Sequence, residues 1–124
     1  GLSPDRAFEM DALVSDGQGA VMTHIILPAD QGRTMQEVRA GVDALDAELV
    51  AMLARRFAYM RAAARIKPDA DMVRDEARKA AVIAGAVKAA DAQNLPTDVI
   101  AAMWEVLVEG SIAYEAAEWA RVRA

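Results

Sequence analysis

Residues 35–67 read MQEVRAGVDALDAELVAMLARRFAYMRAAARIK, and this stretch determines most of the architecture. Large apolar residues recur in it at alternating steps of three and four, which is the pattern of one face of an α-helix. These positions are Met35, Val38, Val42, Leu45, Leu49 and Met52. Thr34 and Glu37 form a capping-box pattern at the start, and Pro68 stops the helix. The sequence therefore predicts a helix of about 33 residues, or about 50 Å.

Arg56 occupies the next position of this apolar face, one heptad after Leu49. A guanidinium group on a buried face is costly unless it meets an anion. Two kinds of partner are open: a carboxylate of the protein itself, or a bound ligand. In the first case, basic residues of the long helix pair with acidic ones on a solvated face: Arg55, Arg56, Arg61 and Arg65 with Asp43, Asp46 or Glu48.

Two further helices are predicted, over residues 72–92 and 97–122, with the breaker Gln93-Asn94-Leu95-Pro96 between them. The inner face of the second helix is predicted to consist of Val73, Ala77, Ala80, Ala84 and Val87. Residues 35–124 contain no alternation typical of a strand. The fold class is therefore all-α, with three helices and a very long first helix. A chain of 124 residues cannot cover a helix of that length, so we expect its apolar face to pack against a second copy.

Residues 1–34 differ in composition from the rest of the chain. Pro4, Gly17, Gly19, Pro28 and Gly32 interrupt any long helix. We interpret residues 1–34 as an irregular N-terminal extension, some of it attributable to cloning or processing, and residues 35–124 as the helical domain. The apolar segment HIIL at 24–27 is expected to dock on a neighbour or to form a short extended piece.

The composition excludes several classes of function. The formal net charge is −5 and no basic run is present, which argues against a nucleic-acid partner. The chain has no Cys and a single His, His24, so thiolate chemistry and a conventional zinc or haem site are not expected. No apolar run approaches the roughly 18 residues that span a bilayer, and no signal peptide is recognisable. We expect a cytoplasmic protein without a membrane partner.

Charged and polar residues of the three predicted helices are spaced so that they can converge. Arg56 and Lys67 are 11 positions apart, close to three turns, so they share a face about 16 Å apart along the axis. Pairs on one face also occur in the other two helices: Asp75 with Arg78, and Ser111 with Glu115. Such a set suits a compact dicarboxylate.

Arg39 lies 17 positions before Arg56, about 25 Å away along a straight helix and on a different face. It cannot reach the same small site within one helix. If two long helices pair antiparallel across a dimer, the partner's Arg39 can reach it.

These residues resemble the motifs of the AroQ-type chorismate mutases, a family that includes isochorismate pyruvate lyases. The motifs of the first helix are VRAGVDALD at 38–46, LVAMLARR at 49–56 and AAARIK at 62–67. Those of the other helices are VRDEAR at 73–78 and LVEGSIAYE at 107–115. The resemblance covers about residues 35–122, and the order and spacing of the motifs make it fairly specific.

The resemblance implies an intertwined homodimer with two identical sites that convert chorismate to prephenate, a pericyclic rearrangement without cofactor, nucleophile or metal. It implies that Arg56 and the partner's Arg39 bind substrate carboxylates, and that Arg78 also contacts the substrate. Lys67 corresponds to the lysine beside the ether oxygen. Asp75 and Ser111 correspond to polar positions that line the site.

Two positions depart from the family pattern. Glu115 stands where glutamine is common and donates to the ether oxygen, although some members carry glutamate. A carboxyl group donates only when protonated, so we expect burial to keep Glu115 protonated and activity to fall as pH rises. The alternative is an ionised Glu115 paired with Lys67. Lys79 stands where many members have a glutamate that contacts the substrate hydroxyl; it either turns outward into solvent or alters substrate choice.

Three other functions compete with the mutase. Isochorismate pyruvate lyases have similar first-helix motifs; Asp75 and Arg78 favour the mutase, and Lys79 slightly favours the lyase. An aminodeoxychorismate mutase is a smaller alternative. A non-catalytic helical dimerisation module is a different class, which predicts that Arg56 pairs with an internal acid and that no pocket exists. The aromatic residues are expected to serve in packing: Tyr59, Trp104, Tyr114 and Trp119.

Overall fold

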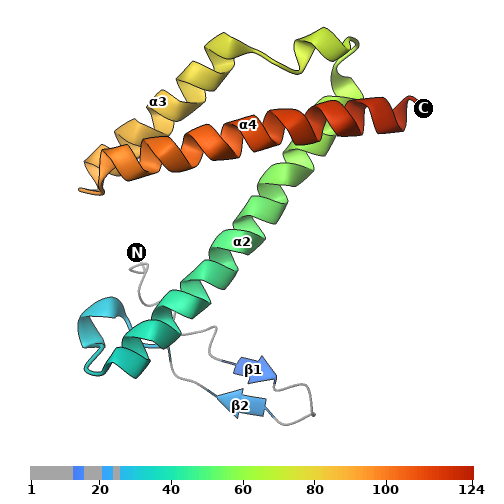
Figure 1. The fold of residues 1–124 in the computed structure, drawn as a ribbon. Coiled ribbons are helices and arrows are strands. Elements are labelled where there is room, and N and C mark those ends of the chain that lie inside the picture. Colours follow the sequence, from blue (N-terminus) through green and yellow to red (C-terminus); the bar gives the residue numbers. More distant parts are fainter. Residues whose placement is uncertain (1–12, 16–20, 24–25) are drawn as a thin grey trace, which may run out of the picture. The chain divides into compact units, whose positions relative to one another are not determined.

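Three α-helices make up most of the described part of the chain (Figure 1). The computed structural model describes residues 13–15, 21–23 and 26–124. The helices are α2 (Met35–Ile66), α3 (Glu76–Ala92) and α4 (Thr97–Val122), and the 3-10 turns are η1 (Ala29–Gln31) and η2 (Ala70–Met72). The predicted all-α class with a long first helix is confirmed.

A short β-hairpin precedes the helices. Strand β1 (Leu13–Ser15) pairs antiparallel with β2 (Val21–Thr23), with Leu13 opposite Thr23. These are the only strands among the described residues. His24, with part of the predicted apolar segment, lies outside the described residues, whereas Ile26 is buried.

The chain divides into two compact units, Gly1–Ala54 and Arg55–Ala124, and α2 contributes to both. In the described part of the chain, no helix is long and apolar enough to cross a bilayer.

The predicted capping box starts α2. The backbone N–H of Glu37 donates to Thr34 Oγ1 at 3.1 Å, and the N–H of Thr34 donates to Glu37 Oε1 at 3.0 Å. These two contacts satisfy donors that the first turn of a helix leaves unpaired. Along residues 35–54 the apolar face is exposed in the single chain, with Leu45 at 48% and Leu49 at 49% of their full accessible surface. Its burial against a second copy stays a prediction.

Helix α3 begins four residues later than predicted. Asp75 has an extended backbone, with φ −135° and ψ 100°, and its side chain accepts a hydrogen bond from the N–H of Arg78 at 3.0 Å. Asp75 is therefore the N-cap rather than part of the helix, and the chain before it forms η2.

The predicted inner face of α3 is largely wrong. Ala77, Ala80 and Ala84 are exposed, whereas the half-buried or buried residues are Lys79, Val82, Ile83, Ala86, Val87 and Ala90. Alanine is so frequent in this helix that hydrophobicity hardly distinguishes one face from another. Among the predicted residues, Val87 does lie on the packed face, and Val73 is buried ahead of the helix.

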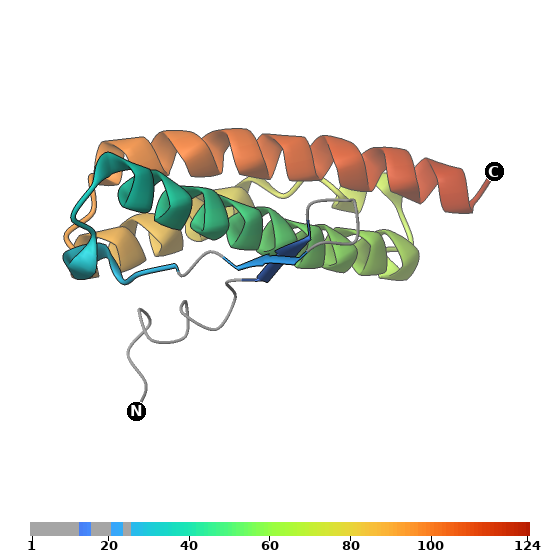
Figure 2. The ribbon, with the colours of Figure 1, turned by 90° about the horizontal axis from the view of Figure 1, so that it is seen from below.

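The turn between α3 and α4 contains Asn94, whose backbone conformation lets the chain reverse direction. Asn94 adopts a left-handed conformation with φ 58°, which asparagine tolerates better than most residues. The N–H of Leu95 then donates to the carbonyl of Ala90 at 2.9 Å, which closes the end of α3. Helix α4 leaves this turn and lies beside α3 (Figures 1 and 2).

Candidate active site

A pocket of about 440 Å³ lies within residues 55–124, between the C-terminal part of α2, the start of α3 and α4. Seven polar side chains considered in the sequence line it: Arg56, Lys67, Asp75, Arg78, Lys79, Ser111 and Glu115. Apolar side chains complete the wall, among them Met60, Val82 and Val108. Arg39, an exposed residue of α2, is not among the lining residues.

Arg56 is held by a hydroxyl group instead of a carboxylate. Its Nη1 donates to Ser111 Oγ at 2.7 Å, and Ser111 Oγ donates to the carbonyl of Leu107 at 2.6 Å. Ser111 is buried and Arg56 half-buried. Among the described residues, no carboxylate forms an ion pair with Arg56. The internal acid that a non-catalytic module predicts is therefore missing from the described chain.

Lys67 and Glu115 form an ion pair at the other end of the pocket. The distance from Lys67 Nζ to Glu115 Oε2 is 2.7 Å, and the Glu115 side chain is only 6% exposed. This is the contact that the alternative with an ionised Glu115 predicts. Lys67 directly follows the last residue of α2 and Glu115 belongs to α4, so the contact also ties the end of α2 to α4.

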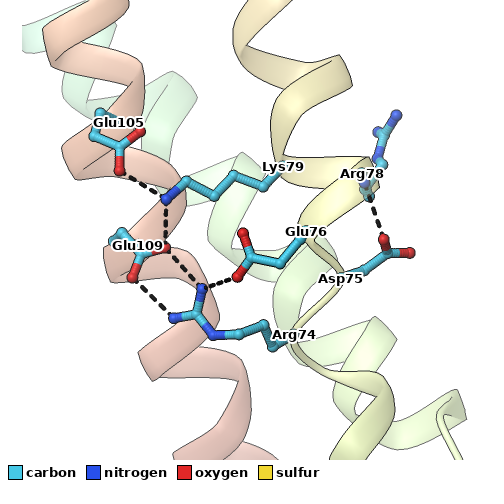
Figure 3. Close-up of polar contacts among 7 residues, drawn as sticks. All are labelled: Arg74, Asp75, Glu76, Arg78, Lys79, Glu105 and Glu109. Carbon is cyan, nitrogen blue, oxygen red and sulfur yellow. Dashed lines mark hydrogen bonds and ion pairs between the residues drawn. The ribbon is translucent and has the colours of Figure 1, made fainter.

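Arg78 and Asp75 lie at the start of α3. Asp75 caps the helix by accepting a hydrogen bond from the backbone N–H of Arg78, and both residues line the pocket. The Arg78 side chain is exposed and leaves α3 in a different direction from Lys79 (Figure 3). In the described part of the chain it has no carboxylate partner. Arg78 is thus a second guanidinium group of the pocket that no described carboxylate neutralises.

Lys79 is tied to α4 rather than turned into solvent. Its Nζ lies 2.7 Å from Glu105 Oε1 and 2.9 Å from Glu109 Oε2, and the side chain is 17% exposed (Figure 3). Hydrogen bonds to these two glutamates, that to Glu105 first, raise the pKa of Lys79. The interpretation of Lys79 as an outward, solvated residue is therefore wrong.

Arg74 extends the same network. It donates to both carboxylate oxygens of Glu109, at 2.8 and 3.0 Å, and to Glu76 at 2.8 Å (Figure 3). Hydrogen bonds from Arg74 and then Lys79 lower the pKa of Glu109 to about 2. This network was not predicted from the sequence, although the four-residue spacing places Glu105 and Glu109 side by side on α4.

The lining carries four cationic side chains against two carboxylates. Of the cations, Lys67 and Lys79 are paired with glutamates, whereas Arg56 and Arg78 form no ion pair with any of the described residues. The pocket is therefore suited to an anion with two negatively charged groups. Among the described residues, no cluster of His, Asp or Glu could hold a metal ion.

A family model described as chorismate mutase type II matches residues 38–116. The chain belongs to this family. The matched segment includes nearly all of α2, the whole of α3 and most of α4, and it contains Arg39 and every lining residue of the pocket. A chorismate mutase is an isomerase with chorismate as its substrate, so the family accounts for a pocket whose two guanidinium groups have no ion pair among the described residues. A search of curated proteins found no match to this chain.

Proposed function

We propose that the protein is a chorismate mutase that converts chorismate to prephenate in the pocket of α2, α3 and α4. The observation that carries the proposal is Arg56, a half-buried guanidinium at the pocket wall that contacts Ser111 and no described carboxylate. Chorismate is a dicarboxylate, and a planar guanidinium binds a carboxylate through two parallel hydrogen bonds.

The first contribution to the rate is orientation. In a pericyclic rearrangement, the bond that breaks and the bond that forms belong to one molecule, whose two ends must be held together. Arg56, fixed by Ser111, binds one carboxylate, and Arg78 provides a further contact. Holding the chair-like conformer removes much of the entropic part of the barrier. The rearrangement only redistributes electrons within the substrate, so it requires no cofactor.

The second contribution is electrostatic. Negative charge grows on the ether oxygen as the C–O bond breaks, so a donor placed there stabilises the transition state more than the ground state. We assign this role to Lys67. Its ammonium group has three N–H donors, one of which is directed to Glu115. The others remain for the substrate.

Glu115 is proposed as a second donor to the ether oxygen in its protonated form. Lys67 donates to Oε2, which leaves Oε1 to carry the proton. In the ionised form, Glu115 acts instead as an acceptor that orients Lys67. The two roles predict different responses to pH, because only the first is lost as the carboxyl group ionises.

The proposal includes a homodimer with shared sites. The exposed apolar face of α2 supplies the surface for a second copy, and its large residues run from Met35 to Met52. Arg39 is also exposed, four positions after Met35, and its side chain is proposed to complete the partner's pocket. This arrangement places one substrate carboxylate on Arg56 and the other on the partner's Arg39.

One observation favours a second candidate, isochorismate pyruvate lyase. Lys79 lines the pocket as a cation, where the mutase pattern has a carboxylate. Lysine cannot accept a hydrogen bond from a substrate hydroxyl group. The presence of Asp75 and Arg78 supports the mutase as the first choice.

Incubation of the purified protein with chorismate and, separately, with isochorismate tests the proposal. We expect prephenate from chorismate and little pyruvate or salicylate from isochorismate. Formation of salicylate and pyruvate from isochorismate would show instead that the protein is an isochorismate pyruvate lyase. If neither substrate is consumed, both assignments are wrong, and the dimerisation module would need to be tested by the oligomeric state alone.

A further inference from the structure

Side chains of α4 and of its C-cap residue donate hydrogen bonds to backbone carbonyl groups at the C-terminal end of α2. Helix α2 ends at Ile66, and the N–H of Lys67 still donates to the carbonyl of Ala63 at 2.9 Å. The last carbonyl groups of a helix lack partners within that helix, and Pro68 has no N–H with which to continue the pattern. These carbonyl groups need donors from elsewhere.

Trp119 and Arg123 supply those donors. Trp119 Nε1 donates to the carbonyl of Lys67 at 2.9 Å, and Arg123 Nη2 donates to the same oxygen at 2.8 Å. Arg123 Nη1 also donates to the carbonyl of Ala64 at 2.9 Å. The guanidinium carbon lies 4.2 Å from the centre of the Trp119 ring, so the two side chains support each other.

Trp119 of α4 and the C-cap residue Arg123 continue a row that begins with pocket residues. Ser111, Glu115, Trp119 and Arg123 follow one another at intervals of four, so each lies next to the one before it. Glu115 binds the ammonium group of Lys67 at 2.7 Å. This row therefore contacts Lys67 at two points: Glu115 binds its ammonium group, and Trp119 and Arg123 bind its backbone carbonyl group.

We propose that Trp119 and Arg123 are positioning residues for Lys67. Lys67 follows the last residue of α2 and precedes a loop, so nothing within α2 fixes its carbonyl group. The two hydrogen bonds from Trp119 and Arg123 fix the peptide unit next to the side chain that extends into the pocket. The effect on activity rests on the proposed function, in which the ammonium group of Lys67 donates to the substrate. Trp119 and Arg123 then set the direction of that donor.

The test compares Trp119→Phe and Arg123→Met with Arg121→Met. Phenylalanine keeps the ring and loses the N–H donor. Arg121 is a matched control, because it lies on α4 and, within the described residues, its ion pair is with the neighbouring Glu118 at 2.6 Å. We expect the first two variants to lose about tenfold in kcat with little change in KM, as misplacing a catalytic group does. Arg123→Lys should recover part of the loss, and Arg121→Met should behave as wild type.

A double-mutant cycle separates positioning from general stability. In a Lys67→Met background, Trp119→Phe should have no further effect on kcat, because the group that it positions is gone. A purely structural role predicts the opposite: a lower Tm with unchanged kcat at temperatures where the variant is folded. Equal kcat for Trp119→Phe and Arg121→Met would overturn the inference, as would additive losses in the cycle.

A second measurement does not depend on activity. The side-chain ¹H–¹⁵N correlation of Lys67, identified by its disappearance in Lys67→Met, reports on how firmly the ammonium group is held. We expect a resolved signal in wild type and Arg121→Met and a broadened one in Trp119→Phe. If wild type consumes neither substrate, the proposed function fails while this signal still decides the inference. Identical signals in Trp119→Phe and wild type would overturn it.

Discussion

Residues 35–54 and residues 55–66 of α2 continue one helical pattern, yet their surroundings differ. In the first part, the large apolar residues are exposed in the single chain, as Leu45 and Leu49 illustrate. In the second part, Ala64 is fully buried, and Met60 and Ala63 line a pocket. Arg56, the charged residue on the pattern, falls in the second part and lies at that pocket. The apolar periodicity thus predicts the helix, and Arg56, the charged residue that interrupts this periodicity, lies at the pocket.

The largest expected effect connects these two parts of α2. If the first part of one chain completes the pocket formed by the second part of another, Arg39→Ala and Arg56→Ala should each lose activity by about 100-fold or more. Mixing the two inactive variants after reversible unfolding should restore roughly a quarter of the wild-type rate, because half the dimers are mixed and each contains one intact site. Chorismate consumption measures the recovery.

In the control mixture, Arg39→Ala is combined with a double variant that carries both Arg39→Ala and Arg56→Ala. Its mixed dimers with Arg39→Ala contain no intact site, so no activity should return. If activity returns in the control mixture, or fails to return in the test mixture, the proposal that two chains share each site is wrong.

A smaller effect is expected at the pocket end occupied by Glu115. If its protonated form donates to the ether oxygen, kcat should fall progressively as the pH rises between about 5 and 9. Glu115→Gln keeps a donor at every pH, so its profile should be flat. A flat profile for wild type would exclude the protonated donor and favour the role in which an ionised Glu115 orients Lys67. The Glu115→Gln rate across the same range is the reference.

The smallest effect concerns stability at acid pH. The pKa of Glu109 is lowered from 4.5 to about 2 by hydrogen bonds from Arg74 and Lys79, so the folded state favours its ionised form. The ionised Glu109 stabilises the folded state fully at pH values above the pKa of its carboxyl group in the unfolded chain. This stabilisation is lost as the pH falls from about 4.5 towards 2. Thermal unfolding should therefore show a slightly shallower fall in Tm for Glu109→Gln than for wild type across that range. Asp98→Asn, on an exposed residue of α4, is the matched control and should follow wild type.

Local signals predicted α2 well. The capping box and Pro68 mark its two ends, and the structure has the helix at Met35–Ile66. The start of α3 was missed because Asp75 was assigned to the helix, although its side chain is a typical cap. The inner face of α3 was missed because an alanine-rich helix has little contrast between its faces.

Spacing within each helix pointed to six of the polar residues that line the pocket, since residues three, four or eleven positions apart share a face. Except for the pairing of Lys67 with Glu115, which was one of two alternatives, contacts between helices could not be predicted in this way. The pairing of Lys79 with Glu105 and Glu109, and the hydrogen bonds from Trp119 and Arg123 to Lys67, depend on the packing of distant segments. Trp119 was predicted to serve in packing, and its indole N–H gives it a polar contact as well.

The most direct measurement is the rate of prephenate formation from chorismate by wild type, Arg56→Met and Arg55→Met. Arg55 is exposed and does not line the pocket, so it controls for the loss of one positive charge beside the site. We expect Arg56→Met to lose at least about 100-fold in kcat/KM, while Arg55→Met stays close to wild type. Equal rates for the two variants would contradict the claim that Arg56 is held in the pocket to bind the substrate.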